Sequence, residues 1–496
     1  MARCRSKAAA ALLALSVSAP AIAQTNSSDK PTWWNKYEFL AAHGPDTCTG
    51  QPSLKVGANV NVSNECGPQS ETFVAINPSR PANLAGGSNE IFRLPMRGYF
   101  STDGGATWGG VDLPLPPAKG NGLNFGSDPS LAFDSRGNVF YGYIVVYFGN
   151  GNGINATAVG VARSSDGGRT YPQFTLFSLE GGSGHFNDKP IITADANPAS
   201  PFRDSVYIAW DAATGGSSGG GVRLARSVDH GKTFTTTRVD DPRGPGRAIG
   251  AVPFVGPNGE VYVAWNDYAA NTIVFNRSLD GGVTWEQPRT VSRKRLPFDI
   301  AIPAEFSRGA LVYPSCDSDR SAGARRGRLY CSWMDLNAAG NTDILASYSD
   351  DGGGSWTPAM PATDAIGGVD RFNHWLAVDP VTGDVNVSFY DTRNDTTGAR
   401  YVTDIYLSQS RTGAASWLPN VRVSDESSNE HDCDGVFPCD GINYGNQQGD
   451  YAGLASYGGV SHAFWTDSRA QLDARAGCRT GLAMEEVFSA AIAVKR

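Results

Sequence analysis

One short phrase returns five times along this chain, at intervals that fit one repeating unit of structure. Each copy has a serine, an aspartate two positions later, a glycine two further on, then threonine or serine and an aromatic residue. Aspartate and serine side chains bond to nearby backbone N–H groups, while glycine adopts the positive φ of a tight turn. The phrase therefore predicts a hairpin turn with an aromatic plug beneath it. The copies are STDGGATW at 101, SSDGGRTY at 164, SVDHGKTF at 227, SLDGGVTW at 278 and SDDGGGSW at 349.

The repeated aspartates are assigned to the turns rather than to catalysis. A repeat fold needs its turn in every unit, whereas an active site does not need five copies of one carboxylate. A sixth, degenerate copy is SRTGAASW at 410, in which Thr412 takes the aspartate position and Ala414 the second glycine position. The five aspartates are Asp103, Asp166, Asp229, Asp280 and Asp351.

The spacing of the copies predicts an all-β fold. From Asp103 to Thr412 the steps are 63, 63, 51, 71 and 61 residues, which is room for four strands with their loops. Strand-like runs precede each copy in a fixed order, with β-branched and aromatic residues and period-2 alternation. Seven first strands are expected, with starts near Glu71, Asp128, Asp188, Ala251, Ile302, His374 and Tyr451.

These units indicate a single β-propeller of seven four-stranded blades. The seventh unit ends after its third strand, and residues 56–63 supply the missing fourth strand, which closes the ring and removes free sheet edges. No linker divides the chain. We therefore expect a signal peptide at 1–23, a segment of unassigned structure at 24–54, and the propeller at 55–496.

The N-terminus has the features of a secretory signal. Arg3, Arg5 and Lys7 precede an apolar run, and Ala21-Ile22-Ala23 forms a small-x-small cleavage site. No later run approaches the ~20 apolar residues that a membrane helix needs. The mature protein is expected to be secreted or periplasmic, with no membrane insertion.

Disulfides are expected in such an oxidising compartment. Cys4 leaves with the signal, and Cys478 has no assigned partner. Local spacing suggests three pairs, although it does not fix the connectivity: Cys48 with Cys66, Cys316 with Cys331, and Cys433 with Cys439.

Charge argues against nucleic acid as a partner. The net charge is −8, and no run of lysine or arginine forms a basic stripe. We expect a monomer whose partner is a glycan or polysaccharide.

The repeated phrase resembles the Asp-box, or bacterial neuraminidase repeat, of the sialidase superfamily. The resemblance covers about residues 70–490. Phe92-Arg93-Leu94-Pro95 is similar to an arginine motif of that family. The resemblance implies arginines that grip a substrate carboxylate, a tyrosine nucleophile assisted by a glutamate, and an aspartate acid/base. Because sialidases have six blades, six is the alternative blade number.

Candidate site residues gather where first strands begin and second strands end, on the face opposite the Asp-box turns. Crowded carboxyls there suit acid/base work, because like charges raise one pKa, and guanidinium groups match a sugar carboxylate. The predicted catalytic residues are Asp128, Asp188, Asp450, Tyr451 and His374. The predicted substrate-binding residues are Arg93, Lys189, Arg393 and Arg469.

One metal site is suggested by the segment 429–450. Asp432, Asp434 and Asp440 offer the hard oxygen ligands that calcium prefers, although the spacing is not that of an EF-hand. Calcium is therefore the one cofactor considered, and a disulfide-pinned surface lid is the alternative.

These features favour a secreted sialidase-like exo-glycosidase that acts on a terminal acidic sugar. Two alternatives stay open. One is a non-catalytic propeller that binds glycan or protein. The other is a polysaccharide lyase, in which Tyr451 and His374 abstract a proton from a uronate.

Overall fold

A computed structural model describes residues 54–117, 119, 122–148, 154–181, 186–212, 220–243, 247–431, 447–472 and 483–494. The expected signal peptide lies outside these residues, as do most of the segment 24–54 and the cysteines at 4, 48, 433, 439 and 478. Residues 55–493 form one compact unit. In the described part of the chain there is no helix long and apolar enough to span a membrane.

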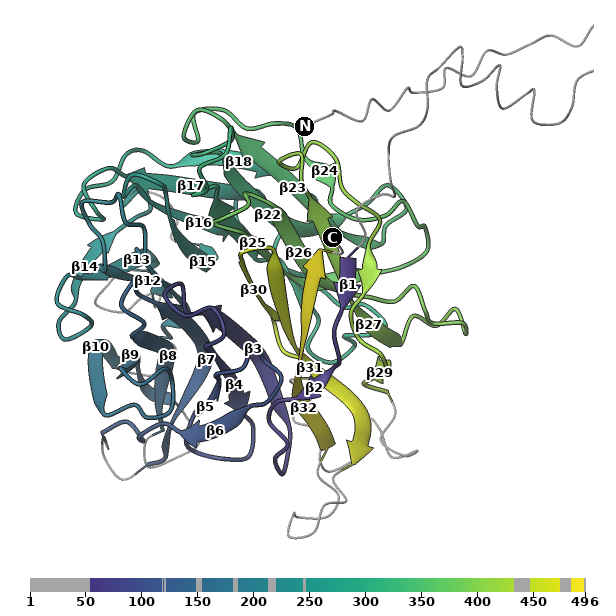
Figure 1. Cartoon of the computed structure of the whole chain (residues 1–496), viewed down its shortest axis with the longest axis horizontal. Coiled ribbons are helices and arrows are strands. Elements are labelled where there is room, and N and C mark those ends of the chain that lie inside the picture. The colour runs from purple at the N-terminus through teal and green to yellow at the C-terminus, as the bar shows by residue number, and fades with distance from the viewer. Residues whose placement is uncertain are drawn as a thin grey trace, which may run out of the picture. The chain divides into compact units, whose positions relative to one another are not determined.

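Seven antiparallel blades form this unit within the described residues (Figure 1). The first three blades follow one another without interruption. Blade 1 contains β3 (Gln69–Ile76), β4 (Leu84–Glu90), β5 (Arg97–Ser101) and β6 (Gly109–Asp112). Blade 2 contains β7 (Asn124–Phe133), β8 (Val139–Phe148), β9 (Ile154–Ser164) and β10 (Gln173–Gly181). Blade 3 contains β11 (Asp188–Ala194), β12 (Val206–Ala212), β13 (Gly221–Ser227) and β14 (Thr235–Arg238).

The next three blades repeat this order, and blade 6 carries the short β29 (Ser428–Asn429) beside β27. Blade 4 contains β15 (Ala248–Val255), β16 (Val261–Asp267), β17 (Thr272–Ser278) and β18 (Arg289–Arg293). Blade 5 contains β21 (Pro314–Ser318), β22 (Leu329–Leu336), β23 (Thr342–Ser349) and β24 (Met360–Pro361). Blade 6 contains β25 (Arg371–Val378), β26 (Val385–Asp391), β27 (Val402–Ser410) and β28 (Val421–Arg422).

The two ends of the chain share blade 7, which confirms the expected closure. Its inner strands are β30 (Gly453–Tyr457), β31 (Val460–Leu472) and β32 (Ala483–Val494). The N-terminal β1 (Leu54–Val56) and β2 (Val60–Asn61) both pair with β32, so purple β1 lies beside the yellow C-terminal strands in Figure 1. Seven blades, not six, is therefore the architecture.

One predicted boundary was wrong. The fifth unit was expected to begin near Ile302, but its first strand β21 begins at Pro314. Residues 299–311 instead form a two-stranded hairpin of β19 (Asp299–Ile300) and β20 (Ala310–Leu311), inserted between blades 4 and 5. We call it the cap hairpin.

The Asp-box turns join third to fourth strands, as predicted. In the first box the Ser101 hydroxyl donates to Asp103 at 2.8 Å, and the Gly105 amide donates to the Ser101 oxygen at 2.9 Å. The Thr107 amide and hydroxyl both donate to the same carboxylate, at 3.0 and 2.6 Å. These bonds hold the pKa of Asp103 at about 2, so the repeated aspartates serve the turns.

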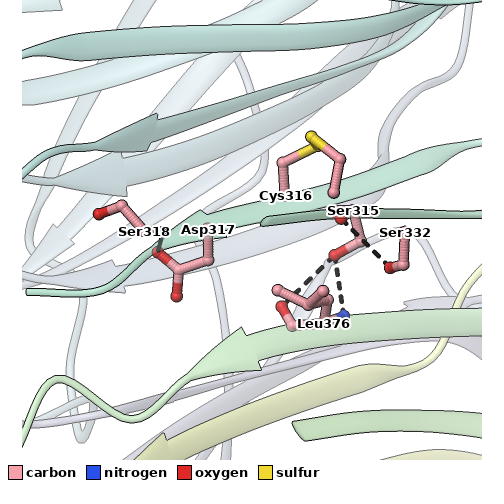
Figure 2. Close-up of a disulfide and its surroundings, with 7 residues drawn as sticks. Ser315, Cys316, Asp317, Ser318, Ser332 and Leu376 are labelled. Carbon is pink, nitrogen blue, oxygen red and sulfur yellow. Dashed lines mark hydrogen bonds between the residues drawn. A yellow bond between two sulfur atoms is a disulfide. The ribbon is translucent and has the colours of Figure 1, made fainter. Parts of the chain in front are cut away.

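A disulfide joins the first two strands of blade 5. Cys316 on β21 lies directly opposite Cys331 on β22 and is bonded to it, which confirms one expected pair (Figure 2). Beside it, the Ser315 hydroxyl and the Ser332 hydroxyl bond to backbone carbonyls of Leu376 and Ser315, so blade 5 is also tied to blade 6. Cys66 is disulfide-bonded as well. Such bonds are typical of oxidising compartments.

The centre of the propeller is divided into two regions. The later halves of the inner strands line a mainly apolar cavity of about 370 Å³. Above it, Phe73, Trp375 and Tyr451 pack together, with ring centroids 5.0 to 6.4 Å apart. The strand starts lie beyond this aromatic layer, at the end of the channel opposite the Asp-box turns. We call that end the mouth.

Candidate functional site

A recurring bulge aims side chains toward the mouth. In five inner strands the register with the second strand shifts near the strand start. The residue inside each bulge has a positive φ, between 45° and 70°. For any residue but glycine this conformation costs about 1 kcal/mol, and such strain persists where the surroundings enforce it, often at functional sites. The five residues are Glu71, Asp128, Lys189, Gly250 and Asn373.

Lys189 is the cation at the centre of the mouth. Its side chain is only 3% exposed, and its Nζ lies 3.0 Å from the Asp450 carboxylate and 3.9 Å from Glu71. The ammonium group also lies 3.8 Å from the ring centre of Tyr451 and 4.7 Å from that of Tyr313. Burial alone would lower the pKa of Lys189, but the charges of Asp450 and Glu71 outweigh it and raise that pKa. Lys189 therefore stays charged.

Asp450 joins the blades to the cap hairpin. Arg308 of that hairpin donates from Nε and Nη2 to its two carboxylate oxygens, at 2.7 and 2.8 Å, and the Tyr313 hydroxyl donates to Oδ2 at 3.1 Å. Burial would raise the pKa of Asp450, but Lys189 and Arg308 hold it well below its usual value. Asp450 is therefore a permanent anion.

Two aspartates of neighbouring blades form a second group. Asp188 hydrogen-bonds to Asp128, and burial together with the charge of Asp128 raises the pKa of Asp188 well above its usual value. The Ser127 hydroxyl donates to Asp128 at 2.8 Å. Asn89 accepts from the Asp128 amide at 2.8 Å. The pair therefore favours the protonated form of Asp188.

Glu71 lies between the two groups. Asn89 donates to its carboxylate at 2.8 Å. Burial raises the pKa of Glu71 well above its usual value. The charge of Lys189 lowers this pKa, whereas the charges of Asp128 and Asp450 raise it further. Gly449 is required beside it, because a Cβ there would collide with the Glu71 side chain.

The structure thus brings Asp128, Asp188, Lys189, Asp450 and Tyr451 together. Tyr451 is buried, and its hydroxyl donates to the Pro129 carbonyl at 2.8 Å. Burial raises its pKa well above 10, so the phenol is neutral. Its expected role as a nucleophile stays a prediction.

Arg308 and Tyr313 were missed from the sequence, since both lie in the stretch that was assigned to the start of the fifth unit. The Arg308 side chain is 37% exposed, so it opens the buried cluster to solvent. Among the described residues, none accepts a hydrogen bond from its Nη1. The ring of Tyr313 fills the space over Gly250, where a Cβ would collide with it. The sequence signal for Tyr313 is Gly250 of blade 4, which has no side chain and so leaves room for the ring of a tyrosine just before blade 5.

The three predicted arginines lie in separate ion-pair groups. Arg93 bonds to Glu65 at 2.7 Å and to Asp112 at 2.7 Å. No described contact joins Arg93 to the mouth cluster.

The other two arginines are neutralised in the same way. Arg393 contacts Asp391 and Asp364 at 2.7 and 2.9 Å. Arg469 contacts Asp467 and Asp425 at 2.8 and 2.7 Å. Each arginine thus joins an aspartate of its own blade to one that follows the last strand of the preceding blade, and their expected role in substrate binding stays a prediction.

His374 is buried between blades 5 and 6. Burial lowers its pKa to about 4, against a hydrogen bond to the backbone of Ser332, so its imidazole is neutral at physiological pH. Its neighbour Asn373 donates to the Gly449 carbonyl at 2.8 Å.

The predicted calcium ligands Asp432, Asp434 and Asp440 lie outside the described residues. Within the described ranges, no group of three histidine, cysteine or acidic side chains is placed to hold a metal ion.

No protein-family model matches the sequence, and no curated protein matches it either. Solved sialidases are among the structures similar to this chain. A leech intramolecular trans-sialidase has a TM-score of 0.46 and 12% identity, over 79% of this chain and 72% of that one. A Streptococcus pneumoniae sialidase has a TM-score of 0.46 and 10% identity, over 75% and 70%.

A mutant α-L-arabinofuranosidase from Fusarium graminearum has a TM-score of 0.44 and 13% identity, over 72% of this chain and 98% of that one. The propeller assignment itself rests on the strand order of the seven blades.

Proposed function

We propose that this protein is an extracytoplasmic glycoside hydrolase that removes a terminal acidic sugar from glycans, with its active site at the mouth. The observation that carries the proposal is the hydrogen-bonded Asp128–Asp188 pair at the mouth, where burial and the charge of Asp128 raise the pKa of Asp188 and the charged Lys189 lies nearby. The disulfide of blade 5 supports a place outside the cytoplasm.

Asp188 acts as the general acid. A glycosidase needs a carboxyl group that is still protonated near neutral pH to donate to the leaving oxygen. Asp128 keeps the proton on Asp188 through its charge and its hydrogen bond. As Asp188 releases its proton, the hydrogen bond from Asp128's neighbour Ser127 keeps the pair oriented.

Arg308 and Lys189 supply the attraction for an acidic sugar. Arg308 uses one edge of its guanidinium on Asp450, so Nη1 is available for a substrate carboxylate. Lys189, which contacts the same Asp450 carboxylate, adds a second positive charge. Asp450, which is ionised, holds both cations in place through its bonds to Arg308 and Lys189.

The direct test is hydrolysis of fluorogenic sialosides and glucuronides by the mature protein. Asp188→Asn is expected to reduce kcat by about 100-fold or more, because general acid catalysis contributes that much. Arg308→Ala is expected to raise KM for acidic substrates. Arg243→Ala is the control, since Arg243 is exposed and contacts Asp241 at 3.0 Å.

A non-catalytic glycan-binding propeller is the second candidate. It is favoured by the local neutralisation of Arg93, Arg393 and Arg469, which leaves few cations for a catalytic site. Calorimetric binding of an acidic glycan without turnover, weakened by Arg308→Ala and unaffected by Asp188→Asn, would select this candidate. Among the described residues no contact favours the lyase, because the Tyr451 hydroxyl bonds to a backbone carbonyl and His374 is buried between blades 5 and 6.

A further inference from the structure

The cap hairpin is held over the mouth by residues of the last blades. The Gln447 side chain accepts from the Ser307 and Arg308 amides at 2.9 and 3.1 Å, and it donates to the Ala304 carbonyl at 3.1 Å. On the other side, the ring of His431 packs on Phe306 with centroids 4.1 Å apart. These contacts fix the turn that presents Arg308 to Asp450.

The same turn inserts an acidic residue into the protein interior. Glu305 is 0% exposed, and among the described residues neither carboxylate oxygen has a hydrogen-bond partner. A hydrogen bond within the hairpin closes the turn that contains Glu305: the Gly309 amide donates to the Glu305 carbonyl at 3.1 Å. The hairpin therefore cannot sit over the mouth without burying this carboxyl.

The surroundings of Glu305 are acidic. Glu430 and Glu485 are each 2% exposed and hydrogen-bond to each other. Four titratable groups face Glu305 besides Arg308, from the segments that pack against the cap: Glu430, Glu485, Asp450 and Tyr390. Arg308 is the one cation among these described neighbours, and Asp450 already occupies two of its nitrogens.

A second buried group beside Glu430, the side-chain amide of Gln448, also lacks a hydrogen-bond partner for its oxygen within the described residues. Gln448 is 0% exposed and faces Glu430, and the oxygen in question is its Oε1. An unpartnered buried acceptor is costly, and a nearby protonated carboxyl can satisfy it.

Burial and the neighbouring charges determine whether the Glu305 carboxyl is ionised. An isolated carboxylate in a low-dielectric interior costs far more than it does in water, so such groups take up a proton instead. In the described part of the chain Glu305 has no hydrogen-bond partner that would offset its ionisation, and Glu430 and Asp450 oppose that ionisation. Burial raises the pKa of Glu305 well above its usual value, with Glu430 the next contributor.

We infer that a proton on Glu305 controls the seating of the cap hairpin, and with it the position of Arg308 at the mouth. With Glu305 protonated the hairpin is seated. When Glu305 ionises, its carboxylate leaves the acidic interior for water and draws Arg308 away from Asp450. That this movement regulates turnover rests on the proposed function; the movement itself does not.

The test is hydrogen–deuterium exchange of cap peptides over 299–311 at pH 5.5 and pH 8, corrected for the intrinsic exchange rate and with chelator present throughout. In the wild type, protection of the cap is expected to fall at least tenfold at the higher pH. A raised pKa in the folded form means that ionisation opposes folding as the pH rises. Glu305→Gln, which mimics the protonated acid, is expected to keep the cap protected at both values.

Glu90→Gln is the matched control. The Glu90 side chain is 2% exposed, and burial raises its pKa to about 8, but it lies in blade 1 beside Glu65 and Arg93. This variant should retain the wild-type loss of cap protection. Should Glu305→Gln not fold, Glu485→Gln replaces it and should reduce the pH effect.

Two outcomes would overturn the inference: cap protection that does not change with pH in the wild type, or a change that persists in Glu305→Gln. No substrate is used, so the result is independent of hydrolysis. A pH-dependent cap without hydrolysis would reject only the proposed function, and hydrolysis with a pH-independent cap would reject only this inference.

Discussion

Lys189 shows how a single residue organises the mouth. It is buried in a strained backbone conformation, with φ of 54°, and yet it contacts two carboxylates and two aromatic rings. A buried charge is tolerated only when it is paired. Lys189 therefore makes it possible for Asp450 and Glu71 to approach each other at the centre of the propeller.

Replacing Lys189 with methionine should leave Asp450 and Glu71 buried with less compensating charge. Removing one partner of a buried pair costs about 3 to 5 kcal/mol, and we expect a loss of that size in the free energy of unfolding, measured in urea. Lys232→Met is the control, because Lys232 is exposed at an Asp-box turn. Equal stability of the two variants would contradict the assigned role of Lys189.

The ionisation of Asp211 is expected to make the stability of the protein depend on pH. Burial raises its pKa from 3.8 to about 8, while the Gly250 amide donates to its carboxylate at 2.7 Å. The folded protein then holds a proton that the unfolded chain has lost, so stability contributed by this group falls as the pH rises from about 4 to 8.

Asp211→Asn should remove that dependence, because an amide can still accept from Gly250 without ionising. The stability of the variant relative to the wild type should increase by about 1.4 kcal/mol per pH unit within this window. Urea unfolding at pH 5 and pH 8 measures it. A difference that stays constant between the two pH values would show that Asp211 ionises normally.

At the scale of the element, the Asp-box turn is self-contained. In the sixth copy the Thr412 hydroxyl replaces the carboxylate, accepting from the Ser416 amide at 2.9 Å. The Ala414 amide donates to the Ser410 hydroxyl at 2.8 Å, as the second glycine does elsewhere. Ala414 has φ of 63°, which an alanine adopts only with strain.

Ala414→Gly should therefore stabilise the protein, by about 0.5 to 1 kcal/mol. Ala399→Gly, in the loop at the other end of β27, is the matched control, because Ala399 is not among the residues with positive φ. Thermal and urea unfolding of the two variants should move in opposite directions. Destabilisation by Ala414→Gly would mean that the alanine methyl contributes packing that outweighs the strain.

The turns could be predicted from the sequence because their hydrogen bonds join residues no more than four positions apart. The mouth could be predicted only in part. First-strand starts placed Asp128, Asp188 and Asp450 on one face, but Arg308 lies 142 positions before Asp450 and belongs to an insertion. No local pattern marks such an insertion.

At the scale of the whole molecule, the ring is closed by the N-terminal strands. The Val62 amide donates to the Val487 carbonyl at 2.7 Å, and the Ser63 hydroxyl accepts from the Val487 amide at 2.9 Å. Val62 is 5% exposed and packs with Phe464 and Tyr99. The closure was predictable because the seventh unit lacked a strand and the residues before the first unit could supply it.

Val62→Asp should open blade 7, because a carboxylate would be buried among apolar side chains without a partner. We expect the free energy of unfolding to fall by about 3 kcal/mol or more, with faster hydrogen exchange in β32. Lys55→Asp is the control, since Lys55 is exposed on β1. Unchanged exchange in β32 of the Val62 variant would argue that the ring does not depend on this strand.

The most direct measurement is an NMR assay in which the protein is mixed with a sialoside, a glucuronide and a neutral galactoside in one tube. Release of an acidic sugar, with the galactoside intact and with no release by Asp188→Asn, is the predicted result. Release of the neutral sugar, or acidic-sugar release that persists in Asp188→Asn, would contradict a catalytic mouth built on Asp188, Lys189 and Arg308. Intact glycosides throughout would contradict hydrolysis itself.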